Sequence, residues 1–260
     1  MDWKQASRIA LALTFVGIGV IGLARGSVAP IWQPVPEATR GYELLAYLSG
    51  LVALGCGAGL STRRTATAAA LVLTIALILW TAVFKLPFIF KAPLVEGSYQ
   101  SNGENWVLIA AGSVLYAELA ASGKGLARGL AVRIAWLLYG LALIAFGLSH
   151  FFYLEMTAPL VPTWLGTPVF WAYATGAIYG LCGLAIMTNL APRLGALGAA
   201  ANITLITVLV WTPIMLAGGV TAMHWQETVV SVALMVSSWV LASGSPPATG
   251  WLRRPSPSHR

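Results

Sequence analysis

Apolar residues form long runs along the whole chain, and short polar or proline-rich connections separate these runs. Each run is about 18 residues long or longer, which is enough for a helix to cross a hydrocarbon core of roughly 30 Å. The pattern therefore predicts eight transmembrane helices. Their expected ranges are 7–25, 43–60, 66–84, 105–121, 130–150, 169–187, 194–217 and 226–243.

The composition supports a membrane location for most of the chain. Hydrophobic residues make up 58% of the 260 residues, charged residues make up only 9%, and the mean hydropathy is +0.80. A soluble domain of this length needs many more charged residues to cover its surface. We therefore expect an all-α polytopic membrane protein whose main partner is the lipid bilayer. The first run lacks a clear small-residue cleavage site, so we interpret it as a spanning helix and not as a signal peptide.

Lysines and arginines are distributed unequally between the connections. Eleven of the 15 lie at the chain ends or in connections on the same side as those ends, and four lie on the other side. The positive-inside rule then predicts that both termini lie in the cytoplasm. Basic residues next to anionic lipid also explain the net charge of +7, so no nucleic-acid partner is expected. The Pro- and Ser-rich residues 244–260 predict a disordered basic cytoplasmic tail.

The two halves of the chain resemble each other. Residues 46–60, AYLSGLVALGCGAGL, align without a gap on residues 172–186, AYATGAIYGLCGLAI, and both segments carry a Tyr and a Cys-Gly pair at the same positions. The alignment predicts a tandem duplication, with one four-helix unit in residues 1–122 and a second in residues 128–243. Because four passes return the chain to the side on which it entered, we expect a parallel repeat of two pseudo-symmetric four-helix bundles.

Three segments of the second half carry a resemblance to a known family. They are GLSHF at the end of the fifth predicted helix, APLVPTWL in the connection that follows, and the Tyr and Gly residues of AYATGAIYGLCGL in the next helix. Through them the chain resembles the DoxX-like membrane proteins over residues 135–242 and, more weakly, over residues 8–120. The resemblance implies a tandem fusion of two four-helix units of the bacterial inner membrane. It also implies a quinone- or sulfur-linked redox role, like that of a thiosulfate:quinone oxidoreductase subunit.

His150 is the strongest candidate for chemistry, because ionisable residues near membrane depth usually have a partner or a function. It lies at the outer end of its predicted helix, and Glu155 follows in a connection rich in proline and aromatic residues. This pair could bind a quinone headgroup, with the imidazole donating a hydrogen bond and handling a proton. The alternative is structural, since His and aromatic rings gather at membrane interfaces and the helix dipole favours a His at a helix C-terminus.

Arg25 takes the place of His150 in the first half, at the equivalent helix end. It is expected to reach lipid headgroups or to pair with Glu37 or Glu155. Aromatic side chains of the outer connections are further candidates for ligand binding. These are Trp32, Trp164 and Trp171.

Glu104 and Glu227 begin the fourth predicted helix of each unit. Carboxylates at such positions usually cap exposed N–H groups and suit the helix dipole. The alternative is that both face an outer vestibule together with His150 and His224. Lys85 is expected to pair with Glu104.

Cys56 and Cys182 lie inside corresponding predicted helices. Buried membrane cysteines usually behave as small, inert apolar residues. The alternative is a dithiol pair, which requires the helices 43–60 and 169–187 to touch. The sequence contains neither an HxxxH nor a CxxC pattern, so no metal site is expected. No cofactor is evident, and a quinone is left open by the redox hypothesis.

Three hypotheses for function follow. The first is a non-catalytic accessory or scaffold subunit that holds a membrane or periplasmic protein partner, since the sequence contains no evident catalytic constellation. The second is a quinone- or thiol-linked redox component with an outer-face site around His150, which as an enzyme would be a quinone-linked oxidoreductase. The third is a small-molecule transporter, a class often built from tandem repeats. Against the third, Pro213 is the one proline well inside a predicted span.

Overall fold

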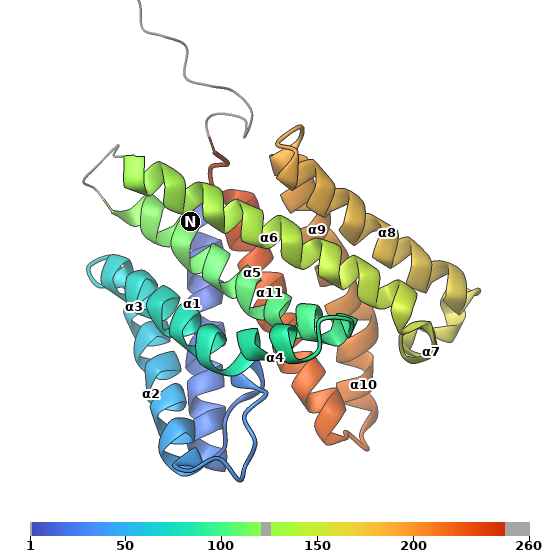
Figure 1. Cartoon of the computed structure of the whole chain (residues 1–260), viewed down its shortest axis with the longest axis horizontal. Coiled ribbons are helices and arrows are strands. Elements are labelled where there is room, and N and C mark those ends of the chain that lie inside the picture. Colours follow the sequence, from blue (N-terminus) through green and yellow to red (C-terminus); the bar gives the residue numbers. More distant parts are fainter. Residues whose placement is uncertain (1, 121–125, 248–260) are drawn as a thin grey trace, which may run out of the picture.

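The computed structural model describes residues 2–120 and 126–247, and these residues form helices and connections without a strand (Figure 1). The long helices among them are α1 (Trp3–Arg25), α2 (Tyr42–Ser61), α3 (Ala66–Trp80), α5 (Glu96–Leu119), α6 (Leu126–Phe152), α8 (Pro168–Met187), α9 (Pro192–Ile206) and α11 (Ala222–Ser243). The short α-helices are α4 (Leu86–Lys91), α7 (Leu154–Thr157) and α10 (Thr212–Ala217). Single 3₁₀ turns are η1 (Pro30–Trp32), η3 (Ala158–Leu160) and η4 (Thr163–Leu165), and the π-helical segments are η2 (Thr81–Lys85) and η5 (Thr207–Trp211).

Seven stretches of the described residues are long and apolar enough to cross a membrane, and they indicate a multi-pass membrane protein. They are Trp3–Arg25, Tyr42–Ser61, Ala66–Lys91, Gly129–Phe152, Pro168–Met187, Pro192–Ala217 and Ala222–Ser243. The expected span at 105–121 overlaps α5, which is not among the seven because its first half is rich in polar residues. An eighth span stays a prediction. Of the expected tail 244–260, the part from residue 248 lies outside the described residues.

The ends of the helices follow from the local sequence. The Asp2 side chain accepts a hydrogen bond of 2.7 Å from the N–H of Gln5 and so caps α1, which ends at Gly26 with φ 61°. Glycine adopts this left-handed conformation without steric cost. Pro168 and Pro192 begin α8 and α9, where the missing N–H of proline would have no partner in any case.

Each half of the chain forms a group of four long helices. In the first half α2 packs against α1 and α3, and α3 packs against α5; in the second half α8 packs against α6 and α9, and α9 packs against α11. The two groups lie side by side in Figure 1. Between them α1 packs against α11, α6 packs against α5, and α5 packs against α11.

Glycines allow the first two helices of each group to approach closely. A Cβ added to Gly57 of α2 would lie 2.5 Å from the backbone nitrogen of Val16 on α1. A Cβ added to Gly183 of α8 would lie 2.7 Å from the carbonyl oxygen of Gly140 on α6. Small residues at such contacts are typical of helix packing in membranes.

Helix boundaries recur at a constant spacing. Pro168 begins α8 126 residues after Tyr42 begins α2, and the α9 start, the η5 start and the α10 start follow those of α3, η2 and α4 by the same 126 residues. Both π-helical segments lead into a short helix whose second residue is proline, Pro87 or Pro213. Proline has no backbone N–H and cannot donate a hydrogen bond. Each helix therefore continues across this point with a changed pattern of backbone hydrogen bonds.

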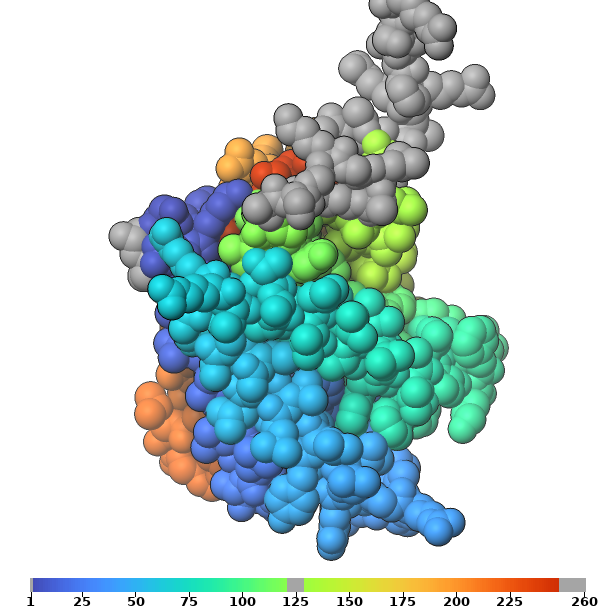
Figure 2. All heavy atoms as spheres, turned by 90° about the vertical axis from the view of Figure 1, so that its left-hand side faces the viewer, coloured from blue at the N-terminus to red at the C-terminus, as the bar shows by residue number. Residues whose placement is uncertain are grey.

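The two ends of the described chain lie at the same end of the molecule (Figure 1). The hydroxyl oxygens of Ser7 on α1 and Ser243 on α11 are 3.1 Å apart. Lys4 forms an ion pair of 2.7 Å with Glu118 near the end of α5. The outer faces of α2 and α3, toward the viewer in Figure 2, expose large apolar side chains, as expected of a surface in contact with lipid.

Candidate functional site

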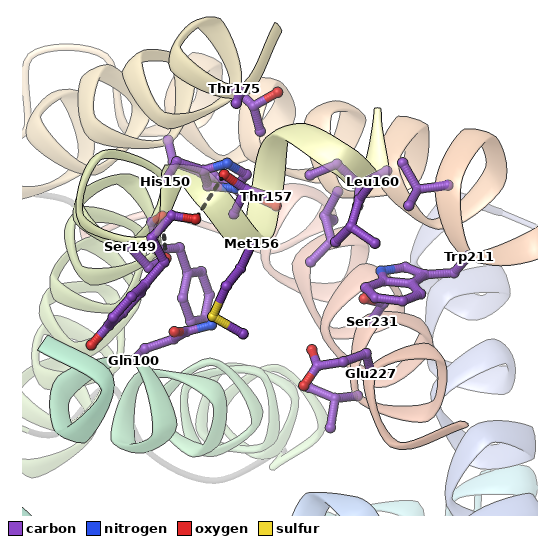
Figure 3. Close-up of a pocket in the computed structure, with 18 of the residues that line it drawn as sticks. Gln100, Ser149, His150, Met156, Thr157, Leu160, Thr175, Trp211, Glu227 and Ser231 are labelled. Atoms are coloured by element: carbon purple, nitrogen blue, oxygen red, sulfur yellow. Dashed lines mark hydrogen bonds between the residues drawn. The ribbon is translucent and has the colours of Figure 1, made fainter. Parts of the chain in front are cut away.

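A cavity of about 440 Å³ lies between the helices of the second half and α5 (Figure 3). Its walls come from α5, α6, α8, α9 with η5, and α11, and from the α7 and η3 segment. It lies at the end of the molecule opposite the described chain ends. Apart from two tyrosines, the polar or charged side chains in its lining belong to Gln100, Glu104, Ser149, His150, Thr157, Thr175, Glu227 and Ser231.

His150 lines this cavity from the last turn of α6. Its ring lies 6.0 Å from the ring of Tyr179, and its Cβ atom would lie 2.8 Å from a Cβ added to Gly176 of α8. Its Nδ1 atom is buried and has no hydrogen-bond partner among the described residues. The candidate histidine therefore lies in the cavity wall with one buried ring nitrogen that has no partner among the described residues.

Glu155 is not brought to His150. The helix breaks at Tyr153, whose φ of −114° and ψ of 43° are not helical, and α7 then carries Glu155 to the exposed surface. Met156 and Thr157 of the same segment line the cavity instead. The structure thus separates the two residues expected to act together.

Glu104 and Glu227 both line the cavity, and they are close enough for their charges to interact. Lys85, whose side chain is fully buried, donates a hydrogen bond of 3.1 Å to the Glu104 carboxylate and one of 2.9 Å to the Ser101 carbonyl. The expected pairing of Lys85 with Glu104 is therefore confirmed. Within residues 2–120 and 126–247, no side chain or backbone group donates a hydrogen bond to the Glu227 carboxylate, and no cation pairs with it.

His224 does not join this cavity. It occupies the first turn of α11, where its N–H donates a hydrogen bond of 3.1 Å to the Thr221 hydroxyl. Its Nδ1 accepts from the Thr221 N–H at 3.5 Å, which completes a capping box. The cavity therefore gathers Glu104, Glu227 and His150, while His224 caps a helix.

The tryptophans expected in the outer connection do not line the cavity. Trp164 is 70% exposed, and Trp171 donates its indole N–H to the Leu165 carbonyl at 2.9 Å. The rings that do line it belong to Phe146, Tyr153, Tyr179 and Trp211. Helical spacing was an available signal for part of this set, since Phe146 and His150 are four residues apart and share one face of α6.

In the first half, Arg25 and Trp32 have different surroundings. Arg25 lies over the ring of Trp225 at 4.8 Å, a cation–π contact, and forms no ion pair with Glu37 or Glu155. Trp32 is buried, its ring lies 5.1 Å from the ring of Trp80, and its carbonyl accepts a hydrogen bond of 2.6 Å from the Trp80 indole. Trp32 is thus a core residue of the connection between α1 and α2.

The contrast between the halves explains why a cavity is found in the second. By the spacing of 126 residues, Trp80 corresponds to Ile206, a residue of the cavity wall. The ring of Trp32 packs against Trp80, so a side chain from the outer connection occupies the matching space in the first half. The second connection leaves its own tryptophan, Trp164, on the surface.

Cys56 is buried and Cys182 half-buried, and both are free thiols. Figure 1 places α2 and α8 on opposite sides of the molecule along its longest axis. The contact on which the dithiol hypothesis depends is therefore not present. No group of three or more His, Cys, Asp or Glu side chains that could hold a metal ion occurs within the described ranges.

Comparisons of the chain with protein-family models, with curated proteins and with solved structures find no match. The function must therefore be inferred from the cavity and its lining.

Proposed function

We propose that this protein binds a small amphipathic molecule, with an apolar body and a polar head, in the outer cavity of its second half. The observation that carries the proposal is the cavity of about 440 Å³, whose aromatic and aliphatic walls hold a few convergent polar groups. Ligand sites in proteins typically measure roughly 300–1,000 Å³ and combine these two kinds of lining. The His150 side chain and the Glu227 carboxylate, which has no cationic partner among the described residues, are the groups that we assign to a polar head.

The proposal includes a tandem repeat of two four-helix units in a shared orientation. The constant spacing of 126 residues between matching helix starts supports it, as does the position of both chain ends at one end of the molecule. In this arrangement α5 is the eighth span. Its buried Asn102 and Asn105 face protein and not lipid, which lowers the cost of placing them at membrane depth. The excess of basic residues near the chain ends favours cytoplasmic termini in a bacterial inner membrane.

The resemblance to the DoxX-like family agrees with this two-unit layout and stays a prediction. The accessory or scaffold role toward a membrane or periplasmic protein also stays a prediction, and ligand binding would add to it. A quinone is a second candidate for the ligand, favoured by the position of His150. Its imidazole lies in the cavity wall and could donate a hydrogen bond to a quinone carbonyl.

Filling the cavity tests this proposal. Thr175→Trp, with Val210→Trp as a second filling variant, places an indole in the cavity wall, and Leu181→Trp adds the same ring on α8 at a position that is 67% exposed. Each protein is purified in mild detergent, and its organic extract is analysed by mass spectrometry. We expect a small molecule to be enriched with the wild type and with Leu181→Trp, and to be lost from the filled variants. The proposal would be contradicted if all four folded proteins contained the same amount of the small molecule, or if no small molecule were enriched with the wild type.

A further inference from the structure

The charges around the cavity do not balance. Lys85 and Glu104 form a buried ion pair of 3.1 Å, so their charges cancel. Among residues 2–120 and 126–247, Glu227 has no such partner, and none of the described residues that line the cavity is Lys or Arg. His150 also lines the cavity but forms no ion pair with Glu227. The cavity therefore holds, among apolar walls, one carboxyl group without a cationic partner in the described part of the chain, and an unpaired charge there is costly.

The first half shows how a carboxylate on the corresponding helix is neutralised. By the spacing of 126 residues, Lys85 at the end of η2 corresponds to Trp211 at the end of η5. Glu227 lies on the helix that corresponds to the one carrying Glu104, one turn closer to the helix start. The first half thus supplies its own ammonium to its carboxylate, and the second half keeps the carboxylate but has an indole where the ammonium would be.

An indole is also the side chain that best attracts a cation through its ring face. Figure 3 shows Trp211 and Glu227 on the same side of the cavity, with His150 on the opposite side. The rings of Phe146 and Tyr179 line the wall on the α6 and α8 side. A carboxylate combined with aromatic rings is a common way for proteins to recognise a quaternary ammonium or a similar organic cation.

We propose that the ligand of this cavity is a lipophilic organic cation, whose positive charge takes the place that Lys85 occupies in the first half. This inference rests on the proposed function and names the chemical class of its ligand. Glu227 neutralises the charge, Trp211 contacts it through its ring face, and the apolar walls hold the hydrophobic substituents. An anionic ligand is disfavoured by the same carboxylate, and a neutral ligand leaves it uncompensated.

Three probes of similar size and different charge test this inference. Tetraphenylphosphonium is the cation, triphenylphosphine oxide the neutral probe and tetraphenylborate the anion. Their binding to the full-length protein in an uncharged detergent is measured by equilibrium dialysis. We expect the wild type to bind the cation about tenfold or more tightly than the neutral probe, and to bind the anion least. The variant Thr175→Trp separates cavity binding from partition into the micelle, because filling the cavity removes only the former.

Two substitutions identify the groups responsible. Glu227→Gln is expected to weaken cation binding about tenfold or more while leaving the neutral probe unchanged, and retained neutral binding shows that the variant folds. Trp211→Lys places an ammonium at the position equivalent to Lys85 and is expected to abolish cation binding. Trp211→Met removes the ring without adding charge, so it should weaken cation binding less than Trp211→Lys does. Glu155→Gln, on the exposed surface, is the control and should bind like the wild type.

The outcomes separate this inference from the proposed function. If the neutral probe binds the wild type as tightly as the cation, or if Glu227→Gln binds the cation normally, the cation inference is wrong and a cavity for amphipathic molecules remains. If the anion binds most tightly, the inference is also wrong. If no probe binds the folded wild type above the level of Thr175→Trp, both the inference and the proposed function fail.

Discussion

At the scale of single residues, the main polar contact in the interior is the ion pair between Lys85 and Glu104. The Lys85 side chain is fully buried and that of Glu104 is 19% exposed. Two charges in such surroundings are held only because each compensates the other, and additional hydrogen bonds, such as that from Lys85 to the Ser101 carbonyl, satisfy the remaining donors. The pair therefore fixes η2 against α5 more than it stabilises the fold as a whole.

Removing one member of this pair should be far more harmful than removing both. We expect Lys85→Met to lower the free energy of unfolding by about 3–5 kcal/mol, because it leaves the Glu104 carboxylate without a partner. Adding Glu104→Gln to Lys85→Met should recover most of the lost free energy of unfolding. Thermal unfolding in detergent, followed by intrinsic fluorescence, measures the difference. A double variant as unstable as the single one would show that the pair does not compensate a buried charge.

Some residues of the site were predictable and others were not. Lys85, Glu104, His150 and Glu227 stood out because ionisable side chains are rare and costly in apolar sequence. Trp211 did not, since it is one of 11 tryptophans in the chain and nothing local distinguishes its inward position from the outward one of Trp164. In a helix that is apolar all round, periodicity no longer reveals which face is buried.

At the scale of elements, the connections that contain η1 and η4 explain the difference between the halves. Both contain an Ala-Pro step and a tryptophan, but η1 places Trp32 in the core, and η4 leaves Trp164 on the surface. A buried indole fills the outer end of the first half, while the matching space in the second half stays open as the cavity. The connection, and not the helices that it joins, therefore determines which half contains the cavity to which we assign the proposed ligand.

The two tryptophans should respond in opposite ways to truncation. Trp32→Ala removes a ring that packs on Trp80 and leaves a void, so we expect the free energy of unfolding to fall by about 3–5 kcal/mol. Trp164→Ala should change it by no more than about 0.5 kcal/mol, because its side chain is largely exposed. Chemical unfolding of the two variants and the wild type in the same detergent provides the test. Equal losses in both variants would mean that the connections are not asymmetric in solution.

Most helix positions could be predicted from the sequence, because long apolar runs bounded by proline, glycine or basic residues mark them directly. The π-helical segments could not, since Thr81–Lys85 and Thr207–Trp211 read as ordinary helix by composition. The turn at Tyr153 that sends Glu155 outward was also hidden, because no glycine or proline marks it. Such local breaks decide which side chains meet, and apolar periodicity carries no information about them.

At the scale of the whole molecule, the two halves are joined through their fourth helices. The central helices α5 and α11 pack against each other, and each also packs against the first helix of the other half. Glu104 of the first half consequently reaches the cavity of the second. Self-alignment of the sequence predicted two bundles side by side, but this exchange of contacts depends on helix packing across the halves, which the alignment does not describe.

We propose that the second half binds a cation and that the first half does not. The position of a bound cation tests this difference most directly. Tetraphenylarsonium has nearly the shape of tetraphenylphosphonium and carries an anomalous scatterer, so a crystal of the complex locates its charge without interpretation of the surrounding density. We expect one anomalous peak per chain, in the second-half cavity between Trp211 and Glu227. A peak beside Trp32 in the first half, equal peaks in both halves, or an empty second-half cavity would contradict the proposed site.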